Sequence, residues 1–358
     1  MNRQKGYLIL SNGRVFEGWR IGASRDTVGE IVFTTGMEGY TETLTDPSYA
    51  GQIITQTFPL VGNYGVCHND YEGKSAAVGY IVHEICGAPS NFRCEEPVEE
   101  FLCQNGIPGL CGVDTRAVTK VIRGEGVMNA AISSDPDFDR TRIRNWAMKD
   151  AVASVSTGRK QVREAEGDVR FRTALIDYGS KENIIRCLQR RGCEVRVYPY
   201  DTPAEEILDG NPDGIVLSNG PGDPKENLYS IEQIRKLIGK VPMLGICLGH
   251  QLTALALGGE TYKLKYGHRG ANQPVTEKRS GRTYITSQNH GYAVLSDSLE
   301  GIGQEAWTNA NDGSCEGMIY PEHRCFTVQF HPEASGGPRD TEFLFDRFLA
   351  MMGGEKLA

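Results

Sequence analysis

The sequence predicts a two-domain protein in which a β-rich α+β half precedes an α/β half. The chain length of 358 residues allows two domains, each with its own core. In the first half, short runs of β-branched and apolar residues outnumber helical patterns, which is typical of α+β folds. From residue 173 onward, strand patterns alternate with helical patterns. That alternation predicts a mostly parallel sheet covered by helices on both faces.

The first domain is expected to span residues 1–150 and to begin with a β-hairpin. Its strands are predicted at Tyr7–Leu10 and Val15–Gly18, with Asn12 and Gly13 in the turn. β-branched residues and helix N-cap signals then predict strands at 31–35, 52–58 and 76–83, and helices at 96–104 and 115–123.

The second domain is expected to span residues 171–358. Residues 151–170 are polar, mixed in charge and without an apolar period, which predicts a linker. The α/β pattern predicts strands at 173–177, 194–198, 214–217 and 243–246, and helices at 182–190, 204–208 and 230–238. Beyond Gly258 the pattern is β-rich, with strands expected at 260–265, 273–275 and 284–287 and a closing helix at 341–351.

Cys247 is the candidate nucleophile. The apolar run Val241–Ile246 predicts a buried strand, and a helical pattern begins directly after the cysteine. Gly245 and Gly249 flank it, which is typical of a nucleophile on a sharp strand-to-helix turn. A helix N-terminus favours the thiolate, which is the reactive species. A lone cysteine after a strand is most often inert, but this setting favours a nucleophile.

A candidate base and its orienting acceptor occur near the C-terminus, in the stretch FTVQFHPEASGG. A cysteine nucleophile needs a base that takes and returns a proton, and the base needs a hydrogen-bond acceptor. His331 and Glu333 can fill these roles if the fold brings them to Cys247. His331 alone would be interpreted as a surface histidine.

Three motifs together resemble those of class I glutamine amidotransferases: GICLGHQ at 245–251, HPEA at 331–334 and NGPGDP at 219–224. The resemblance implies a nucleophile elbow in the second domain and hydrolysis of L-glutamine. Cys247 would attack the side-chain carboxamide and form a glutamyl thioester, which water hydrolyses. His331 would move the proton, and Glu333 would orient the imidazole.

The resemblance also implies a glutamine pocket. The N–H of the residue after an elbow nucleophile is a natural oxyanion donor, and that residue is Leu248. Family positions that contact glutamine correspond to Gly220, Gly222, Leu248, Gln251, Asn289, Gly291 and Tyr292. Without the family, Asn289–Gly291 would equally be an ordinary turn. Phe330 and Tyr292 depart from common family residues, but neither change removes a reacting group. His268 is not expected to take part in the chemistry.

Most of the first domain resembles the N-terminal domain of the carbamoyl phosphate synthetase small subunit, and Val28–Gly65 carries the resemblance. The family implies a heterodimer, or a higher oligomer, with a large subunit that uses ammonia, bicarbonate and ATP with Mg to make carbamoyl phosphate. It also implies that Ser48 reaches across to help hold glutamine. On chemistry alone, Ser48 would be a turn serine.

Composition and motif content exclude several other classes. A net charge of −8 argues against a non-specific nucleic-acid binder. No apolar run is long enough for a membrane span, and no signal peptide is recognisable, so we expect a cytoplasmic protein with ten reduced cysteines. Neither a C-x-x-C pair nor a complete deaminase motif occurs, so no metal is expected. No phosphate-binding glycine motif occurs either, so we expect no cofactor in this chain, and ATP and Mg on the large subunit.

Alternatives to the carbamoyl phosphate assignment differ in partner or in activity. The chain could feed an anthranilate- or GMP-type synthase, although Val28–Gly65 argues against this. A non-catalytic scaffold would be expected to lack the cysteine, histidine or glutamate, and a thiol hydrolase acting alone would not respond to a partner. The sequence leaves open the partner interface, the oligomeric state, the allosteric control and the pathway, which is arginine biosynthesis, pyrimidine biosynthesis or both.

Overall fold

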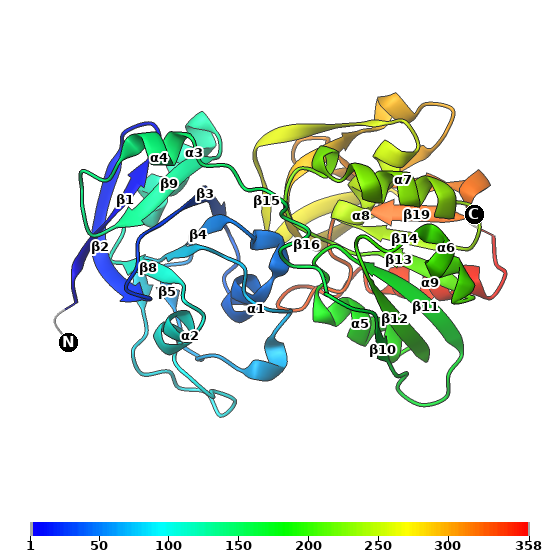
Figure 1. Ribbon diagram of the computed structural model, residues 1–358, viewed down its shortest axis with the longest axis horizontal. Coiled ribbons are helices and arrows are strands. Elements are labelled where there is room, and N and C mark those ends of the chain that lie inside the picture. Colours follow the sequence, from blue (N-terminus) through cyan, green and yellow to red (C-terminus); the bar gives the residue numbers. More distant parts are fainter. Residues whose placement is uncertain (1–2, 357–358) are drawn as a thin grey trace. The chain divides into compact units, whose positions relative to one another are not determined.

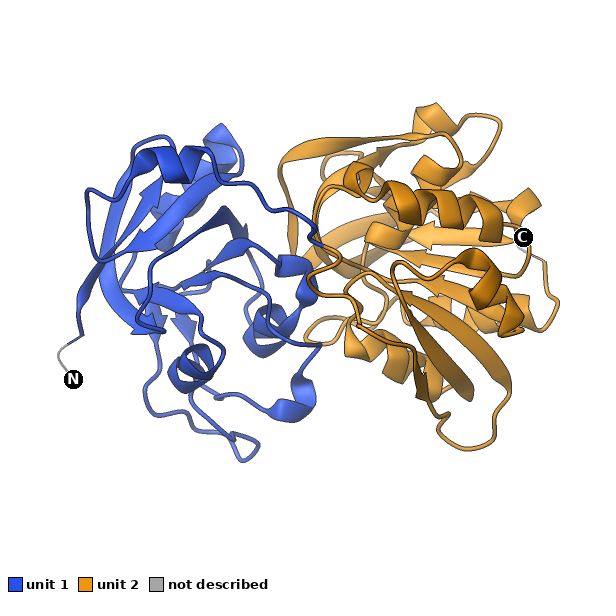
Figure 2. Ribbon diagram, viewed as in Figure 1, with its two compact units in different colours: residues 1–151 blue, residues 152–358 orange. Residues whose placement is uncertain are grey.

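The computed structural model describes residues 3–356, which divide into two compact units (Figure 2). Unit 1 ends at Ala151, and unit 2 begins at Val152. Most of the segment expected to be a linker therefore belongs to unit 2. It contains β10 (Gln161–Arg163), which pairs antiparallel with β12 (Cys193–Pro199).

Unit 1 is built on a closed β-barrel with the strand order β1-β2-β8-β6-β4-β3-β9. The predicted hairpin is confirmed, because β1 and β2 pair antiparallel on either side of the turn at Asn12 and Gly13, where Gly13 has a φ of 95°. The barrel strands are β1 (Lys5–Leu10), β2 (Val15–Gly22), β3 (Thr27–Thr34), β4 (Gln52–Gln56), β6 (Gly79–Ile81), β8 (Pro108–Cys111) and β9 (Met128–Ser133). Neither β8 nor β9 was predicted. The sequence PGLC contains two residues depleted in strands, and MNAAIS contains one β-branched residue.

Helices and a small parallel ladder complete unit 1. The ladder consists of β5 (Leu60–Val61) and β7 (Glu84–Ile85), and the helices are α1 (Tyr40–Thr45), α2 (Val98–Gln104), α3 (Thr115–Glu125) and α4 (Arg140–Arg144). The prediction of α2 and α3 is confirmed. The Asp114 carboxylate accepts the N–H of Ala117 at 2.9 Å, so α3 begins with the expected N-cap.

Unit 2 contains a ten-stranded mixed sheet with the order β10-β12-β11-β13-β14-β19-β18-β16-β15-β17. Its parallel part is formed by β12, β11 (Phe171–Asp177), β13 (Gly214–Leu217), β14 (Met243–Ile246) and β19 (Cys325–Val328). The other strands join antiparallel: β10, β15 (Glu260–Glu277), β16 (Thr283–Leu295), β17 (Gln304–Asn309) and β18 (Cys315–Tyr320). The parallel sheet predicted from the βαβ alternation is thus confirmed for five strands, while the β-rich region after Gly258 extends it with antiparallel pairing.

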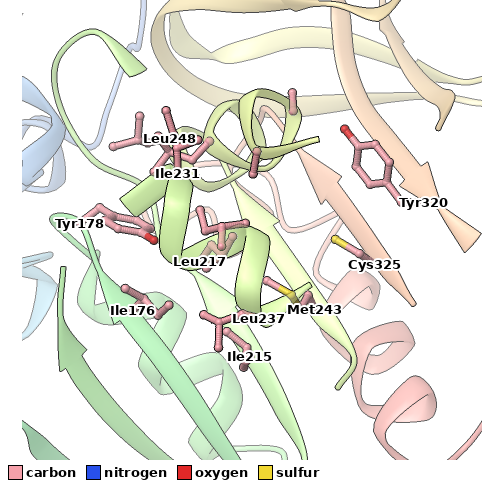
Figure 3. Packing of buried hydrophobic residues seen from close by; sticks show 14 of the residues in the cluster. Ile176, Tyr178, Ile215, Leu217, Ile231, Leu237, Met243, Leu248, Tyr320 and Cys325 are labelled. Atoms are coloured by element: carbon pink, nitrogen blue, oxygen red, sulfur yellow. The ribbon is translucent and has the colours of Figure 1, made fainter. Parts of the chain in front are cut away.

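Helices cover both faces of the parallel strands (Figure 1). They are α5 (Glu182–Gln189), α6 (Ala204–Asp209), α7 (Leu228–Leu237), α8 (Leu248–Ala256) and α9 (Phe343–Met352). Strand residues alternate between the faces. Ile215 and Leu217 pack with Ile231, Leu237 and Leu248 of α7 and α8 (Figure 3). The residue between the two strand positions, Val216, instead packs in the core with α5 and α9.

A tight strand-to-helix turn connects β14 to α8. Cys247, the residue at the turn, has φ 53° and ψ −101°, a conformation that costs a non-glycine residue about 1–3 kcal/mol. Helix α8 lies so close to β13 that a Cβ on Gly249 would be 2.3 Å from the carbonyl oxygen of Leu217. Only glycine at position 249 therefore allows this approach, which holds the strained residue in place.

This close approach predicts that Gly249→Val destabilises unit 2. The added atoms meet backbone rather than a flexible side chain, so we expect a loss of about 3 kcal/mol in the free energy of unfolding, at the upper end of the usual overpacking cost. Denaturant unfolding followed by circular dichroism measures the effect. Gly124→Ala in α3 is the control, because nothing lies within 4 Å of its added Cβ and a stabilisation of about 0.5–1 kcal/mol is expected. Equal unfolding midpoints for Gly249→Val and the parent protein would contradict the packing argument.

Candidate active site

Three sequence motifs meet at one edge of the parallel sheet. Cys247 follows β14, and Asn219 follows β13, the strand paired with β14 on one side. His331 follows β19, the strand paired with β14 on the other side. Because these strands are parallel, their carboxyl ends lie at the same edge, where sites in α/β sheets form. The fold therefore brings together the segments that the sequence analysis assigned to one site.

Cys247 is buried, with 2% of its surface exposed. Its backbone N–H donates to the carbonyl of Val328 at 2.8 Å, so the turn is fastened to β19. The sulfur lies 3.8 Å from the carbonyl oxygen of Asn289 on β16. A residue of the predicted glutamine pocket therefore lies directly beside the predicted nucleophile.

His331 and Glu333 form a buried hydrogen-bonded pair. His331 Nδ1 lies 2.6 Å from a carboxylate oxygen of Glu333, and both side chains have no exposed surface. A carboxylate accepts, so Nδ1 carries the proton, and Nε2 is the nitrogen left to act as a base. Among the described residues, Nε2 has no hydrogen-bond partner. The imidazole thus has the tautomer that a general base at Nε2 requires.

The Glu333 carboxylate is ionised despite its burial. Burial alone would raise its pKa, but the charge of His331, the charge of Lys181 and the hydrogen bond from His331 lower the pKa to about 2. Lys181 Nζ lies 3.4 Å from the same carboxylate oxygen. The Lys181 ammonium and the hydrogen bond from His331 therefore compensate a carboxylate that water does not reach.

Two of the predicted glutamine-contacting residues, Gly220 and Leu248, lie next to each other, and Leu248 directly follows Cys247. A Cβ on Gly220 would come within 2.3 Å of the Tyr178 carbonyl and 2.8 Å of Leu248 Cδ2, so the glycine turn packs against the start of α8. This brings the glycine turn next to Leu248, the predicted oxyanion donor. Gly222 has a φ of 90°, which explains the second glycine of the turn. Whether these groups contact glutamine stays a prediction.

The β16 residues of the predicted pocket are fastened to α8. The Gln251 amide donates to the carbonyl of Tyr292 at 2.9 Å and to the side-chain oxygen of Gln329, also at 2.9 Å. Gly291 lies close to Arg269, because an added Cβ would be 3.3 Å from its guanidinium. Gln251 thus holds the pocket strand, in addition to the glutamine contact predicted for it.

Ser48 belongs to unit 1. It lies in a short 3-10 turn, Pro47–Tyr49, where its N–H donates to the Asp46 carboxylate at 2.9 Å. This geometry matches the turn serine expected on chemistry alone. The role in holding glutamine stays a prediction from the resemblance.

Sequence reasoning missed several residues that support the candidate base. The sequence analysis does not single out Lys181. Its place after β11, at the sheet edge where Cys247 and His331 also lie, could have indicated that it belongs to the site. Its backbone N–H donates to Asn219 at 3.0 Å, and the Asn183 amide donates to the carbonyl of Glu333. The Ser287 carbonyl accepts the N–H of His331 at 2.9 Å. No local pattern in the sequence indicates this last contact, because β16 and the His331 loop are far apart in the chain.

Among residues 3–356, one group of side chains has the chemistry to hold a metal ion: His268, His290 and Glu316, all buried. The sequence predicts no metal because these three residues form none of the recognised spacing motifs. None of the described helices combines the length and the apolar character that a membrane crossing needs.

Comparison with known families finds two matches, one on each side of the boundary between the two units. Residues 8–132 match the family described as "Carbamoyl-phosphate synthase small chain, CPSase domain". Residues 174–351 match "Glutamine amidotransferase class-I". The first match falls within unit 1 and the second within unit 2.

Individual relatives match over nearly the full chain. The "Carbamoyl phosphate synthase small chain" of Clostridium perfringens is 50% identical, with 96% of this chain and 99% of the relative covered. The protein of the same name from Listeria monocytogenes is 49% identical, with 98% of each chain covered. Among solved structures, a glutamine amidotransferase from Thermotoga maritima aligns with a TM-score of 0.39 and 20% identity, over 53% of this chain and 90% of that chain.

The charge pairing predicts that Glu333 stabilises the folded protein except in strong acid. Its folded pKa of about 2 is below the ordinary value of 4.5, so its contribution is complete above pH 4.5 and is lost as the pH falls through 2. At pH 6, Glu333→Gln is expected to lower the free energy of unfolding by an amount on the order of 2 kcal/mol. The difference should shrink toward pH 2.

Unfolding in denaturant at a series of pH values measures this difference. Glu260→Gln, at an exposed glutamate of β15, serves as the control and should show little effect at any pH. A Glu333→Gln difference that stays constant between pH 6 and pH 2 would show that the carboxylate is not compensated as described.

Proposed function

The chain belongs to the family of carbamoyl phosphate synthase small chains and is a glutamine-hydrolysing amidotransferase, and we propose that Cys247, His331 and Glu333 carry out the hydrolysis. The observation that carries this assignment is the fully buried His331–Glu333 pair, with Nδ1 bound to the carboxylate at 2.6 Å. The loop with this pair follows β19, which is hydrogen-bonded to the backbone of Cys247.

In the proposed first half-reaction, Cys247 forms a glutamyl thioester. His331 Nε2 takes the thiol proton, and Sγ attacks the carboxamide carbon of glutamine. The C–N bond then breaks, and the imidazolium gives the proton to the leaving nitrogen, which departs as ammonia. In the second half-reaction, His331 takes a proton from water. The resulting hydroxide attacks the thioester carbon, and glutamate leaves as the thiolate regains the proton.

Fixed charges around His331 prepare it for both half-reactions. An imidazolium forms twice in the cycle, and the ionised Glu333 lies at hydrogen-bond distance from it. Lys181 keeps Glu333 ionised when the imidazole is neutral. The carboxylate therefore holds the tautomer with a basic Nε2 and stabilises the charged form.

Backbone donors would stabilise the tetrahedral intermediates. We assign the oxyanion to the N–H of Leu248 and to the Gly220 turn, which pack against each other. Around the substrate, the proposed contacts are Ser48, Gly220, Gly222, Leu248, Gln251, Asn289, Gly291 and Tyr292. Support for these contacts comes from the family resemblance and, for Asn289, from its carbonyl beside the sulfur.

The ammonia is proposed to pass to a large subunit in a heterodimer. That subunit would bind ATP and Mg and make carbamoyl phosphate from bicarbonate for arginine and pyrimidine biosynthesis. The small-chain names of the relatives support such a partner. We also propose that the chain is cytoplasmic, since its ten cysteines, all of them among the described residues, are free thiols, as expected in a reducing compartment.

Replacement of the nucleophile tests the assignment directly. Cys247→Ser is expected to lower the rate of glutamate release by 10³-fold or more, roughly as loss of a nucleophile does in other triad enzymes. The assay uses the full chain with its cognate large subunit, ATP and bicarbonate. Carbamoyl phosphate synthesis from added ammonium salt is the control, since that reaction bypasses Cys247.

Two outcomes would contradict parts of the proposal. Full glutamine hydrolysis by Cys247→Ser would overturn the mechanism. Cys247-dependent hydrolysis that never responds to the large subunit would leave the chemistry standing and remove the proposed coupling to carbamoyl phosphate synthesis.

A further inference from the structure

A second buried charge cluster connects the strands that carry the proposed glutamine pocket. It contains His268 on β15, His290 on β16 and Glu316 on β18, with Asp312 in the turn between β17 and β18. The first three residues are at most 8% exposed, and Glu316 has no exposed surface. The whole cluster lies within unit 2.

His268 lies between two carboxylates. Its Nε2 is 2.8 Å from Asp312, and its Nδ1 is 3.4 Å from Glu316. Burial would lower the pKa of His268, but hydrogen bonds to Asp312 and Glu316 raise it to about 9. Burial raises the pKa of Glu316, and His268 opposes that rise. The charges of His268 and Glu316 therefore depend on each other.

A proton on His268 explains this cluster better than a metal ion does. The Asn309 amide points an N–H at the carboxylate oxygen of Glu316 that faces both histidines, at 2.9 Å. A cation bound there would face the positive end of that amide. The second nitrogen of His268 is occupied by Asp312, so a histidinium satisfies both carboxylates without a metal.

Backbone pairing links the cluster to the active site. His268 pairs with His290, and the next pair along the ladder is Arg269 with Asn289. Asn289 contributes the carbonyl that lies 3.8 Å from the sulfur of Cys247. On β18, the carbonyl of Glu316 accepts the N–H of Gln329, two residues before His331, at 2.8 Å. The ion pair thus joins β15, which pairs with the pocket strand β16, to β18, which pairs with β19, the strand that leads to the proposed base.

We propose that His268 and Glu316 are positioning residues for glutamine binding, whose ion pair fixes residues 288–292 of β16 relative to Cys247 and His331. This inference rests on the proposed function. The proposed role is one of positioning, and the sequence likewise predicts no part in the chemistry for His268. Loss of the pair should weaken substrate binding more than it slows the chemical steps.

Glu316→Gln is the central variant, because it keeps the shape and the hydrogen-bond acceptor for Asn309 but removes the charge. In the complete enzyme, we expect KM for glutamine to rise about 10-fold while kcat changes by less than about 3-fold. Glu305→Gln is the matched control, since it breaks a surface ion pair with Lys278 in the same sheet. The control should leave both constants unchanged.

A double-mutant cycle and a pH profile exclude a merely structural effect. If the two residues act as a pair, His268→Gln combined with Glu316→Gln should raise KM no more than either change alone. The titratable groups facing His268 are Asp312, Glu316 and His290, and the Asn309 amide nitrogen lies 3.4 Å from its Nδ1. In the parent protein the pair is intact well below pH 9 and is lost as His268 deprotonates through about pH 9, so KM should rise there. Glu316→Gln should lack this rise.

Asp312→Asn keeps the proposal testable if Glu316→Gln does not fold, because Asp312 lies at the partly exposed end of the cluster. It should move the rise in KM to lower pH, since Asp312 holds the proton on His268. The inference would be overturned if KM were unchanged in these variants, or if KM rose and kcat fell by equal factors. It would also be overturned if the parent protein bound one zinc ion per chain and Glu316→Gln lost it. No glutamate release by the parent enzyme would instead overturn the proposed function.

Discussion

The candidate active site depends on the compensation of one buried carboxylate. Glu333 has no exposed surface, so its charge has to be balanced by protein groups. His331 at 2.6 Å and Lys181 at 3.4 Å provide that balance. The hydrogen bond to Nδ1 fixes the tautomer of His331 and leaves Nε2 as the base. Lys181 in turn is held by Asn219, so the requirement of a single carboxylate connects loops after β11, β13 and β19.

The nucleophile depends in a similar way on its surroundings, which have to stabilise its backbone conformation. Cys247 adopts a positive φ, which the surrounding packing has to stabilise. The contact of Gly249 with Leu217 and the hydrogen bond from Cys247 to Val328 do so from two neighbouring strands. The second cluster resembles the first in its electrostatics. The Glu316 carboxylate is buried, and the charge of His268 compensates it. Both carboxylates thus restrain segments that lie next to the sulfur.

Local patterns predicted most of the parallel sheet and all three proposed catalytic residues. The βαβ rhythm and the glycines around Cys247 are determined by near neighbours, so they can be recognised in a short window. Strands β8 and β9 escaped prediction because closure of the barrel, rather than their own composition, favours the extended conformation. Lys181, Ser287 and the His268–Glu316 pair escaped because their partners are distant in the chain. Motifs of closely spaced metal ligands do not include His268, His290 and Glu316 for the same reason.

The proposed mechanism requires that the sulfur of Cys247 becomes acylated during glutamine turnover. The most direct test is mass spectrometry of the complete enzyme quenched in acid during steady-state hydrolysis, followed by peptide mapping. We expect one glutamyl group on the peptide that contains Cys247, and its loss when turnover is allowed to finish before the quench. A glutamyl group on another cysteine, with Cys247 unmodified, would overturn the thioester mechanism.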